Sequence, residues 1–321
     1  MPSGIKCLRA VAGLVLAGCT APSTERDAVW VEVSAGAPIE AVAESLVAHG
    51  IVRSAERFIR LARVGGRHDD IEPGVYPLRP GTPQHRVLSV LLRGRPPARR
   101  VVVRERMTLT ELARELELAL GLAPDEVFAA AADSALRLRV GAAGPTAEGY
   151  FYPTTYYLNL SASAAEVLTQ MADTFAARWR PAWDARLDSL GRSRHDVVIL
   201  ASIVAGEMPH PDERFRVSSM YHNRLARGMR LQADPTVVYA LGERRRLSYA
   251  DYRIPSQYNT YTFRGLPPGP IAQPSFESLE ATLYPEDTEF LYMVARADGS
   301  HAFSRTYREH LATIRQIRGR R

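Results

Sequence analysis

The residue with the clearest chemical potential is Glu207, which ends an otherwise apolar stretch over residues 197–206, two positions before Pro209. Read as a helix, this stretch places the carboxyl group on a face that is apolar for two turns. An unpaired charge in such a setting is costly, so we expect a raised pKa and a proton retained near neutral pH. A protonated carboxyl group beside a cleft can act as a general acid. The alternative is a solvated residue at a helix end, or one half of a salt bridge.

A helix with a defined start must hold this carboxyl group in place. Ser193 and Asp196 have the spacing of a capping box, in which each side chain binds the backbone N–H of the other. The pattern therefore predicts a buried helix that begins after Ser193 and ends before Pro209. A shorter helix is predicted over residues 235–241. Asp234 is placed to cap it, a role that competes with a direct contact to substrate.

The front half of the chain contains a strand-helix pattern twice. Residues 29–33 alternate like a strand and a helix follows from Pro38 to Gly50, and residues 101–103 with a helix from Thr108 repeat this arrangement. Further expected elements are a helix over 54–64, a strand over 73–78, a helix over 82–93 and a hinge at 95–97. The pattern resembles the LysM-like glycan-binding modules of cell-wall enzymes. The alternative is a pair of scaffold modules that bind nothing.

The first residues have the features of a secretion signal. A basic start precedes a short apolar run over residues 10–17, which is too short to span a bilayer. The run ends in Leu-Ala-Gly-Cys at residues 16–19, which resembles the bacterial lipobox. This resemblance implies cleavage before Cys19 and lipid attachment to it; the alternative is an ordinary cleaved signal with an incidental cysteine. Because Cys7 is the other cysteine of the chain, no disulfide is expected after cleavage.

Composition and charge exclude some classes of function. The 321 residues are 46% hydrophobic and 24% charged, which allows two ordinary domains with real cores. The net charge of +6 includes arginine clusters at residues 99–100, 244–246 and 318–321. None of them is interleaved with a platform of stacking aromatic side chains, so nucleic acid is not an expected partner. Solvated surfaces, anionic lipid or an anionic cell-wall polymer account for them instead.

Four motifs follow one another in the back half. They are Glu-Gly-Tyr-Phe-Tyr-Pro-Thr-Thr-Tyr at 148–156, the apolar run into Glu207, Asn-Arg-Leu-Ala-Arg-Gly-Met-Arg-Leu-Gln-Ala-Asp-Pro-Thr at 223–236, and Tyr-Asn-Thr-Tyr at 258–261, which runs into Gly-Leu-Pro-Pro-Gly-Pro-Ile-Ala at 265–272. In order and spacing, from about residue 148 to residue 310, they resemble the endolytic murein transglycosylase family, also called MltG or YceG-like. The strand-helix modules in front also fit that family's layout.

This resemblance implies specific roles. Glu207 stands at the position of the family's catalytic acid/base, and neither a cofactor nor a metal is implied. Two positions depart from the family pattern: Ala205 where many members are acidic, and Thr154 where many carry Asp, so a slower enzyme or an altered subsite is conceivable. Asn259 is expected to face ligand, and an arginine partner is the alternative for Glu148. The side chains implied to line the glycan cleft are Glu148, Asn223, Gln232, Asp234, Tyr258, Asn259, Thr260 and Tyr261.

One carboxylate is enough for the implied reaction. Hydrolytic glycosidases usually use two. A lytic transglycosylase protonates the glycosidic bond with one acid, which then takes the proton of the sugar's own 6-hydroxyl as that oxygen closes on the anomeric carbon. A metal site is the competing interpretation, although two prolines interrupt its helix and no His-x-x-x-His pair is present. Its ligands would be Glu207, His210, Asp212, Glu213 and His222.

The sequence thus predicts an α+β fold in which LysM-like strand-helix modules precede an α+β catalytic domain. The expected segments are a lipoprotein-type signal (1–18), a linker (19–28), a LysM-like module (29–97), a second strand-helix module (98–145) and a YceG-like catalytic domain (146–321). The expected function is endolytic cleavage of peptidoglycan glycan strands to 1,6-anhydro-MurNAc ends, which terminates strand elongation. Expected partners are glycan strands, the membrane through a lipid anchor and peptidoglycan synthases, with the catalytic domain outside the cytoplasm. The alternative function is a wall-binding lipoprotein scaffold without catalysis.

Overall fold

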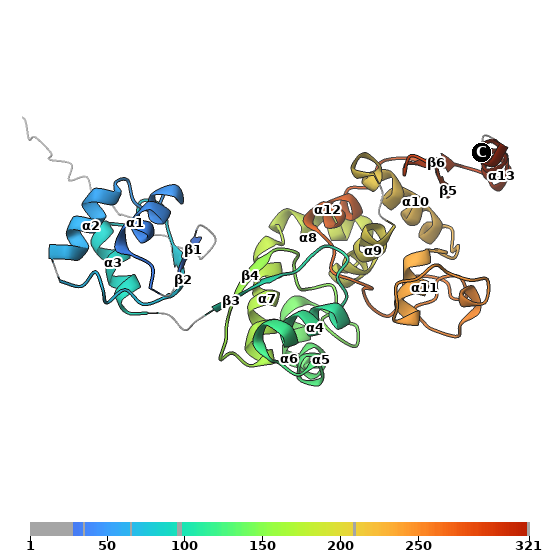
Figure 1. Ribbon diagram of the computed structural model, residues 1–321. Helices are drawn as coiled ribbons and strands as arrows, with labels where there is room; N and C mark the ends of the chain where they lie inside the picture. Colours follow the sequence, from blue (N-terminus) through green and yellow to red (C-terminus); the bar gives the residue numbers. More distant parts are fainter. Residues whose placement is uncertain (1–27, 35, 65, 95–97, 208–209, 320–321) are drawn as a thin grey trace, which may run out of the picture. The chain divides into compact units, whose positions relative to one another are not determined.

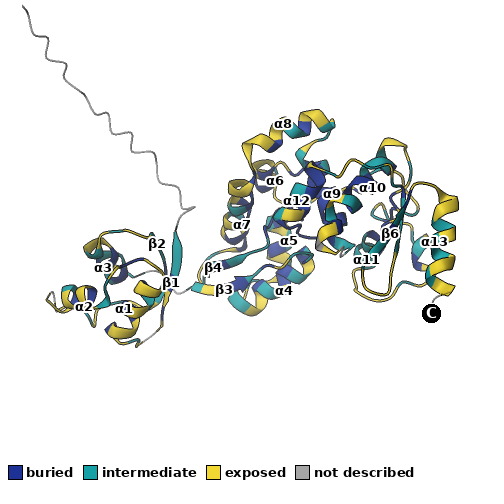
Figure 2. Cartoon of the chain, turned by 90° about the horizontal axis from the view of Figure 1, so that it is seen from above, coloured by how far each residue is buried: buried dark blue, intermediate teal, exposed yellow. Residues whose placement is uncertain are grey.

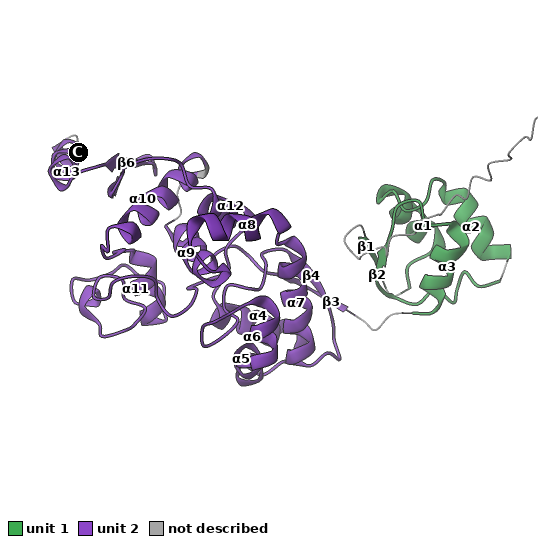
Figure 3. Cartoon of the chain, turned by 180° about the vertical axis from the view of Figure 1, so that it is seen from behind, with its two compact units in different colours: residues 1–94 green, residues 95–321 purple. Residues whose placement is uncertain are grey.

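The chain forms two compact units, residues 1–94 and residues 95–321 (Figure 1, Figure 3). The computed structural model describes residues 28–34, 36–64, 66–94, 98–207 and 210–319. The expected signal segment, Cys19 and the hinge at 95–97 lie outside the described residues. None of the described helices is both long enough and apolar enough to cross a membrane.

The first unit is a strand-helix module closed by a second strand. β1 (Val29–Val33) pairs antiparallel with β2 (Gly74–Leu78), and between them lie α1 (Ile39–Ala48) and α2 (Ala55–Val64), with α3 (Gln84–Leu92) after the second strand. All five elements are confirmed within two residues of their expected bounds. They enclose one apolar core, to which the strands contribute alternate residues because successive side chains of a strand point to opposite faces.

The second unit begins with the same arrangement. β3 (Ala98–Val102) pairs antiparallel with β4 (Thr155–Asn159), and α4 (Leu109–Leu120), α5 (Pro124–Ala132) and α6 (Ser134–Val140) lie between them. The repeat in the sequence is therefore a repeat in the structure. Its matched apolar positions are buried in both copies: Val31, Val33, Ile39, Val42, Ala43 and Leu46 in the first, and Val101, Val103, Leu109, Leu112, Ala113 and Leu116 in the second. Whether either copy is LysM-like stays a prediction.

The strand β4 lies within the segment expected to be the catalytic domain, so that segment and the second strand-helix module share a sheet. The functional division at residues 97 and 145 stays a prediction. The remaining elements are α7 (Ala164–Arg178), α8 (Pro181–Leu190), α9 (Arg194–Gly206), α10 (Arg214–Ala226), α11 (Asp234–Leu241), α12 (Phe276–Leu283), β5 (Tyr292–Ala295), β6 (His301–Ser304) and α13 (Tyr307–Gly319), with short 3-10 turns at Pro211–Glu213 and Asp251–Arg253. The α+β class is confirmed, since the described strands form small antiparallel pairs among many helices.

Helix α9 is the central element of the second unit. α10 and α12 pack against it, and Figure 2 shows it mostly in dark blue, whereas α13 is mostly yellow, the colour of exposed residues. One face of α9, with Val198, belongs to the core of the strand-helix part, and another face, with Ile203, belongs to a separate core beneath α10 and α11. A helix buried on both sides is held rigidly, so the residue at its end has a fixed position.

The start of α9 is the capping box expected from the sequence. The Ser193 hydroxyl oxygen accepts the backbone N–H of Asp196 at 3.1 Å, and the Asp196 carboxylate accepts the backbone N–H of Ser193 at 3.0 Å. These two bonds satisfy donors that the first turn of a helix otherwise leaves free. The prediction of a buried helix with a defined start is confirmed.

Candidate active site

Glu207 is the C-cap residue of α9, where the buried helix reaches the surface. Its carboxyl Oε1 accepts the hydroxyl of Tyr221 from α10, and within the described ranges no hydrogen bond reaches Oε2. Burial raises the pKa of Glu207, the charge of Asp234 raises it further, and the Tyr221 bond and the Arg224 charge lower it, so that the pKa is about 7. The expected raised pKa is confirmed. A group with this pKa can both give and take a proton at neutral pH.

Helices α9 and α11 approach each other closely beside this carboxyl group. A side-chain carbon on Gly206 would lie 2.6 Å from Cβ of Pro235, which is too close for any two such atoms. Glycine at this position therefore permits the contact that brings the first turn of α11, with Asp234, alongside Glu207. The neighbouring departure from the family pattern, Ala205, is 2% exposed and faces the core, where an added acidic group would be desolvated.

Asp234 does not cap α11, and that expectation is wrong. The helix begins at Asp234 itself, its N-cap residue is Ala233, and no side chain caps it. Because Asp234 is the first residue inside the helix and not the residue before it, its carboxylate does not accept the free N–H groups of the first turn. It accepts the Tyr261 hydroxyl at 2.5 Å and the Tyr252 hydroxyl at 3.3 Å instead. The two tyrosines hold an exposed negative charge next to Glu207.

The Tyr-Asn-Thr-Tyr segment forms the wall that carries Tyr261. Asn259 is fully buried; its amide donates to the carbonyls of Tyr252 and Ile254 at 3.1 and 3.0 Å and accepts the backbone N–H of Tyr261. Thr260 is also buried, and its hydroxyl oxygen accepts the backbone N–H of Ala233 at 3.0 Å. These bonds fix Tyr261 against Asp234. Direct contact of Asn259 or Thr260 with glycan stays a prediction.

Gln232 is held in an unusual backbone conformation at the same place. It is an exposed, non-glycine residue with φ of 50°, and its backbone N–H donates to the Thr260 carbonyl at 3.1 Å. The buried guanidinium of Arg224 holds the backbone next to Gln232 in place, because it donates to the carbonyls of Leu231 and Leu291 at 2.6 Å each. Strained residues of this kind persist only where their surroundings hold them, and they gather at functional sites.

A second buried carboxyl group lies toward the other end of α11. Glu148 is 4% exposed and accepts bonds from the Leu109 backbone N–H at 2.7 Å, the Gln273 amide at 3.0 Å and the Tyr239 hydroxyl at 3.1 Å. Burial raises the pKa of Glu148 to about 8. Its partners include no arginine among the described residues, so the alternative of an arginine pair is wrong, and a role of Glu148 in binding glycan stays a prediction. The Tyr239 ring packs on that of Tyr258, at 4.8 Å between centroids.

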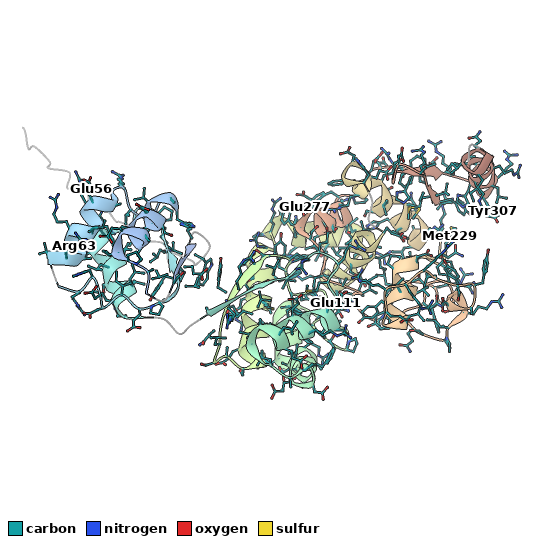
Figure 4. All side chains as sticks on the ribbon, viewed as in Figure 1. Glu56, Arg63, Glu111, Met229, Glu277 and Tyr307 are labelled. Atoms are coloured by element: carbon teal, nitrogen blue, oxygen red, sulfur yellow. The ribbon has the colours of Figure 1, made fainter. Side chains whose placement is uncertain are left out.

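The end of α11 is tied back to the strand-helix part. The Arg244 guanidinium donates to the Glu111 carboxylate of α4 at 2.9 Å and to the Arg106 carbonyl at 2.5 Å (Glu111 is labelled in Figure 4). Both charged side chains are partly exposed, so this pair adds little stability by itself. Its effect is geometric, because α11 is held at both ends.

The predicted site residues fall into three places. Glu207, Asp234, Gln232 and the Asn259–Tyr261 segment lie around the start of α11. Glu148 and Tyr258 both contact Tyr239, toward the other end of that helix. Asn223 lies apart from both. Its amide donates to the carbonyls of Thr288 and Phe290 at 2.8 and 3.1 Å, in the segment that connects α12 to β5. A role in substrate binding for each of these residues stays a prediction.

Of the four tyrosines that donate to these carboxyl groups, sequence reasoning included Tyr261 and missed Tyr221, Tyr252 and Tyr239. Each is separated from its partner by 14 to 91 positions in the chain, and no local spacing links them. The one signal available was composition, since the back half is rich in tyrosine.

The side chains considered above as possible metal ligands bind different partners. Glu213 is buried and accepts the backbone N–H of His301 at 2.9 Å, His222 contacts the Thr282 carbonyl at 2.9 Å, and His210 is exposed beside Asp212. Among the described residues, no three His, Cys, Asp or Glu side chains lie close enough together to hold a metal ion.

Comparison with known proteins gives consistent matches. The model of the YceG-like family matches residues 31–316. An endolytic murein transglycosylase of Bacillus subtilis (strain 168) is 28% identical over 298 residues, which are 88% of this chain and 82% of that protein. One of Streptococcus pneumoniae serotype 2 is 24% identical over 299 residues, 83% of this chain, and the chain spans only 54% of its length. The 2.6 Å crystal structure of a YceG-like protein of Listeria monocytogenes has 29% identity and a TM-score of 0.61, over 89% of this chain and 99% of that one.

Proposed function

The chain belongs to the YceG-like family, and on this premise we propose that it is an endolytic murein transglycosylase, which cleaves peptidoglycan glycan strands between MurNAc and GlcNAc. The observation that carries the proposal is the state of Glu207: a carboxyl group with a pKa of about 7 at the end of a buried helix, whose Oε2 accepts no hydrogen bond from the described residues. The relatives named as enzymes of this activity match the chain across this site. The scaffold alternative is not favoured.

The reaction needs one proton to leave Glu207 and one to return. In the first step Oε2–H of Glu207 protonates the glycosidic oxygen, and the bond from that oxygen to C1 of MurNAc breaks. In the second step the carboxylate takes the proton of the 6-hydroxyl, and O6 forms a bond to C1. The product end is 1,6-anhydro-MurNAc, the other product keeps the protonated oxygen, and no water is consumed. Because the attacking oxygen belongs to the same sugar, its high effective concentration replaces activation of water.

Asp234 supports both steps through its charge. Burial is the main cause of the raised pKa of Glu207, and the charge of Asp234 raises that pKa further, so the proton is retained before cleavage. As C1 becomes positive in the transition state, a fixed negative charge held by Tyr261 and Tyr252 stabilises it without rearrangement. Each of the two Asp234 oxygens accepts one tyrosine hydroxyl, which holds the charge in place and favours this electrostatic role over nucleophilic attack.

The glycan would bind along the start of α11. Gln232 is exposed there, with its side-chain oxygen accepting the Arg224 guanidinium at 3.4 Å, and Tyr261 offers a ring with a hydroxyl group for sugar stacking. Tyr258, packed on Tyr239 further along α11, offers a second ring. We further propose that the strand-helix modules bind glycan as LysM-like modules do, that Cys19 carries a lipid anchor, and that cleavage terminates strand elongation beside a peptidoglycan synthase. The strand-helix repeat supports the first of these, and the lipobox resemblance supports the second.

The test is cleavage of purified glycan strands by the full chain and its Glu207→Gln variant. The amide keeps the shape and can accept the Tyr221 hydroxyl, but it has no proton to transfer, so we expect at least a ~10³-fold loss of activity with unchanged melting temperature. Asp212→Asn is the matched control, because Asp212 is an exposed acid a few residues away. Substantial cleavage by Glu207→Gln would remove Glu207 from the mechanism. Wall binding without cleavage by the unmodified protein would favour the scaffold function.

A further inference from the structure

We infer that Tyr221 is a positioning residue for the reaction: its hydroxyl fixes Oε1 of Glu207 so that Oε2 alone exchanges protons with the glycan. The inference rests on the proposed function and assigns a different role to each carboxyl oxygen: Oε1 accepts the Tyr221 hydroxyl, and Oε2 exchanges the proton. Tyr221 does not touch the reacting sugar, because it reaches Glu207 from the protein interior.

The two carboxyl oxygens of Glu207 differ in their hydrogen bonding, because only Oε1 has a partner among the described residues. Tyr221 lies on α10, is 1% exposed, and is among the largest fully buried side chains of the chain. Its hydroxyl donates to Oε1 of Glu207, which is its one hydrogen bond among the described residues. A buried hydroxyl without an acceptor is unfavourable, so this bond is a constraint on both partners. Because Oε1 accepts the Tyr221 hydroxyl, the proton of the neutral acid resides on Oε2.

The same bond changes strength during the reaction. A hydroxyl donates more strongly to a carboxylate than to a neutral carboxyl group. When Glu207 gives up its proton, the bond to Tyr221 strengthens and stabilises the new negative charge, a gain that the ground state lacks. Tyr221 is a dependable donor in both states, since burial and the charge of Glu207 hold its own pKa well above the usual range.

Other groups around Glu207 raise or lower its pKa. From α10 the Arg224 charge lowers its pKa, from α11 the Asp234 charge raises it, and α9 itself contributes burial, which raises it. Tyr261 lies close enough to raise the pKa of Tyr221, and its own hydroxyl is engaged by Asp234. Removing the Tyr221 hydroxyl therefore removes a contribution that lowers the pKa of Glu207, and that pKa must rise.

The kinetic test compares Tyr221→Phe with a matched control, Tyr156→Phe. Tyr156 is also buried, and its hydroxyl donates to the Tyr152 carbonyl at 2.7 Å in a part of the core without Glu207. For Tyr221→Phe we expect kcat to fall roughly 10- to 100-fold with KM unchanged, and the basic limb of the pH profile to move up by roughly one to two units. Tyr156→Phe should leave both unchanged. Equal behaviour of the two variants would overturn the inference.

A titration without substrate separates this inference from the proposed function. The Glu207 carboxyl carbon, assigned with Glu207→Gln, should titrate at higher pH in Tyr221→Phe than in the unmodified protein by carbon NMR. In the unmodified protein, the NMR signal of the ring carbon bonded to the Tyr221 hydroxyl should change position with a midpoint at the pKa of Glu207. This measurement does not depend on whether any variant folds. If these shifts occur but glycan is never cleaved, the proposed function fails and the pairing stands. If glycan is cleaved but neither shift occurs, Tyr221 only fills space.

Discussion

Replacing Glu148 by Gln should make the second unit more stable at alkaline pH and leave it unchanged at acid pH. Burial raises the pKa of Glu148 in the folded protein to about 8, whereas the unfolded chain releases this proton near the ordinary glutamate pKa of 4.5. Because the folded state binds more protons in this window, its stability is complete below the lower value and falls as pH rises toward the upper one. At 1.36 kcal/mol per pKa unit, Glu148 alone removes up to about 5 kcal/mol between those limits.

Glutamine imitates the protonated acid at this position. Its carbonyl can accept the Leu109 N–H and the Gln273 amide, and its own N–H can donate to the Tyr239 hydroxyl. Glu148→Gln should therefore match the unmodified protein at pH 5 and exceed its free energy of unfolding by several kcal/mol at pH 8.

The assay is urea denaturation from pH 5 to pH 8, followed by the fluorescence of Trp179 and Trp183, which lie in the core of the second unit. Glu117→Gln, at an exposed position of α4, is the control and should keep the full pH slope. An unchanged slope in Glu148→Gln, or an equal loss of stability at both ends of the range, would refute a buried, proton-retaining Glu148.

Three further predictions concern the site and the anchor. Asp234→Asn removes a charge that raises the pKa of Glu207, so the basic limb of the pH–rate profile should move to lower pH; an unmoved limb would mean that Asp234 does not influence Glu207. Gln232→Gly should keep or raise stability by up to about 1 kcal/mol, because it relieves the positive φ, while raising KM for glycan; an unchanged KM would place Gln232 outside the cleft. Cys19→Ala should release the protein from the membrane fraction, and retention with an intact N-terminus would indicate an uncleaved anchor instead of a lipid.

The local part of the architecture could be predicted from the sequence. Periodicity located the two strand-helix repeats, and the Ser193 capping box with Pro209 bounded α9, because these signals involve residues a few positions apart. The raised pKa of Glu207 also followed, since it depends mostly on burial at the end of an apolar helix.

The partners of the side chains could not be predicted in the same way. Asp234 had the local pattern of a cap, but the helix starts one residue earlier and two distant tyrosines take its oxygens. The amide of Asn223 binds the backbone carbonyls of Thr288 and Phe290, which are 65 and 67 positions away in the chain. That of Asn259 binds two carbonyls of the segment just before it. Contact of either side chain with glycan stays a prediction. Pairings such as those of Asp234 and Asn223 depend on which segments meet in space, which no spacing within one motif contains.

The most direct test of the central claim is the chemical nature of the ends made by the purified protein. With Glu207 as acid and then base, and O6 as the attacking group, every new MurNAc end should be a 1,6-anhydro end, one water lighter than a reducing end by mass spectrometry. These ends should arise within strands and be absent with Glu207→Gln. Reducing ends in their place would contradict the single-carboxylate mechanism and make Asp234, beside Glu207, the first residue to test as a base that activates water.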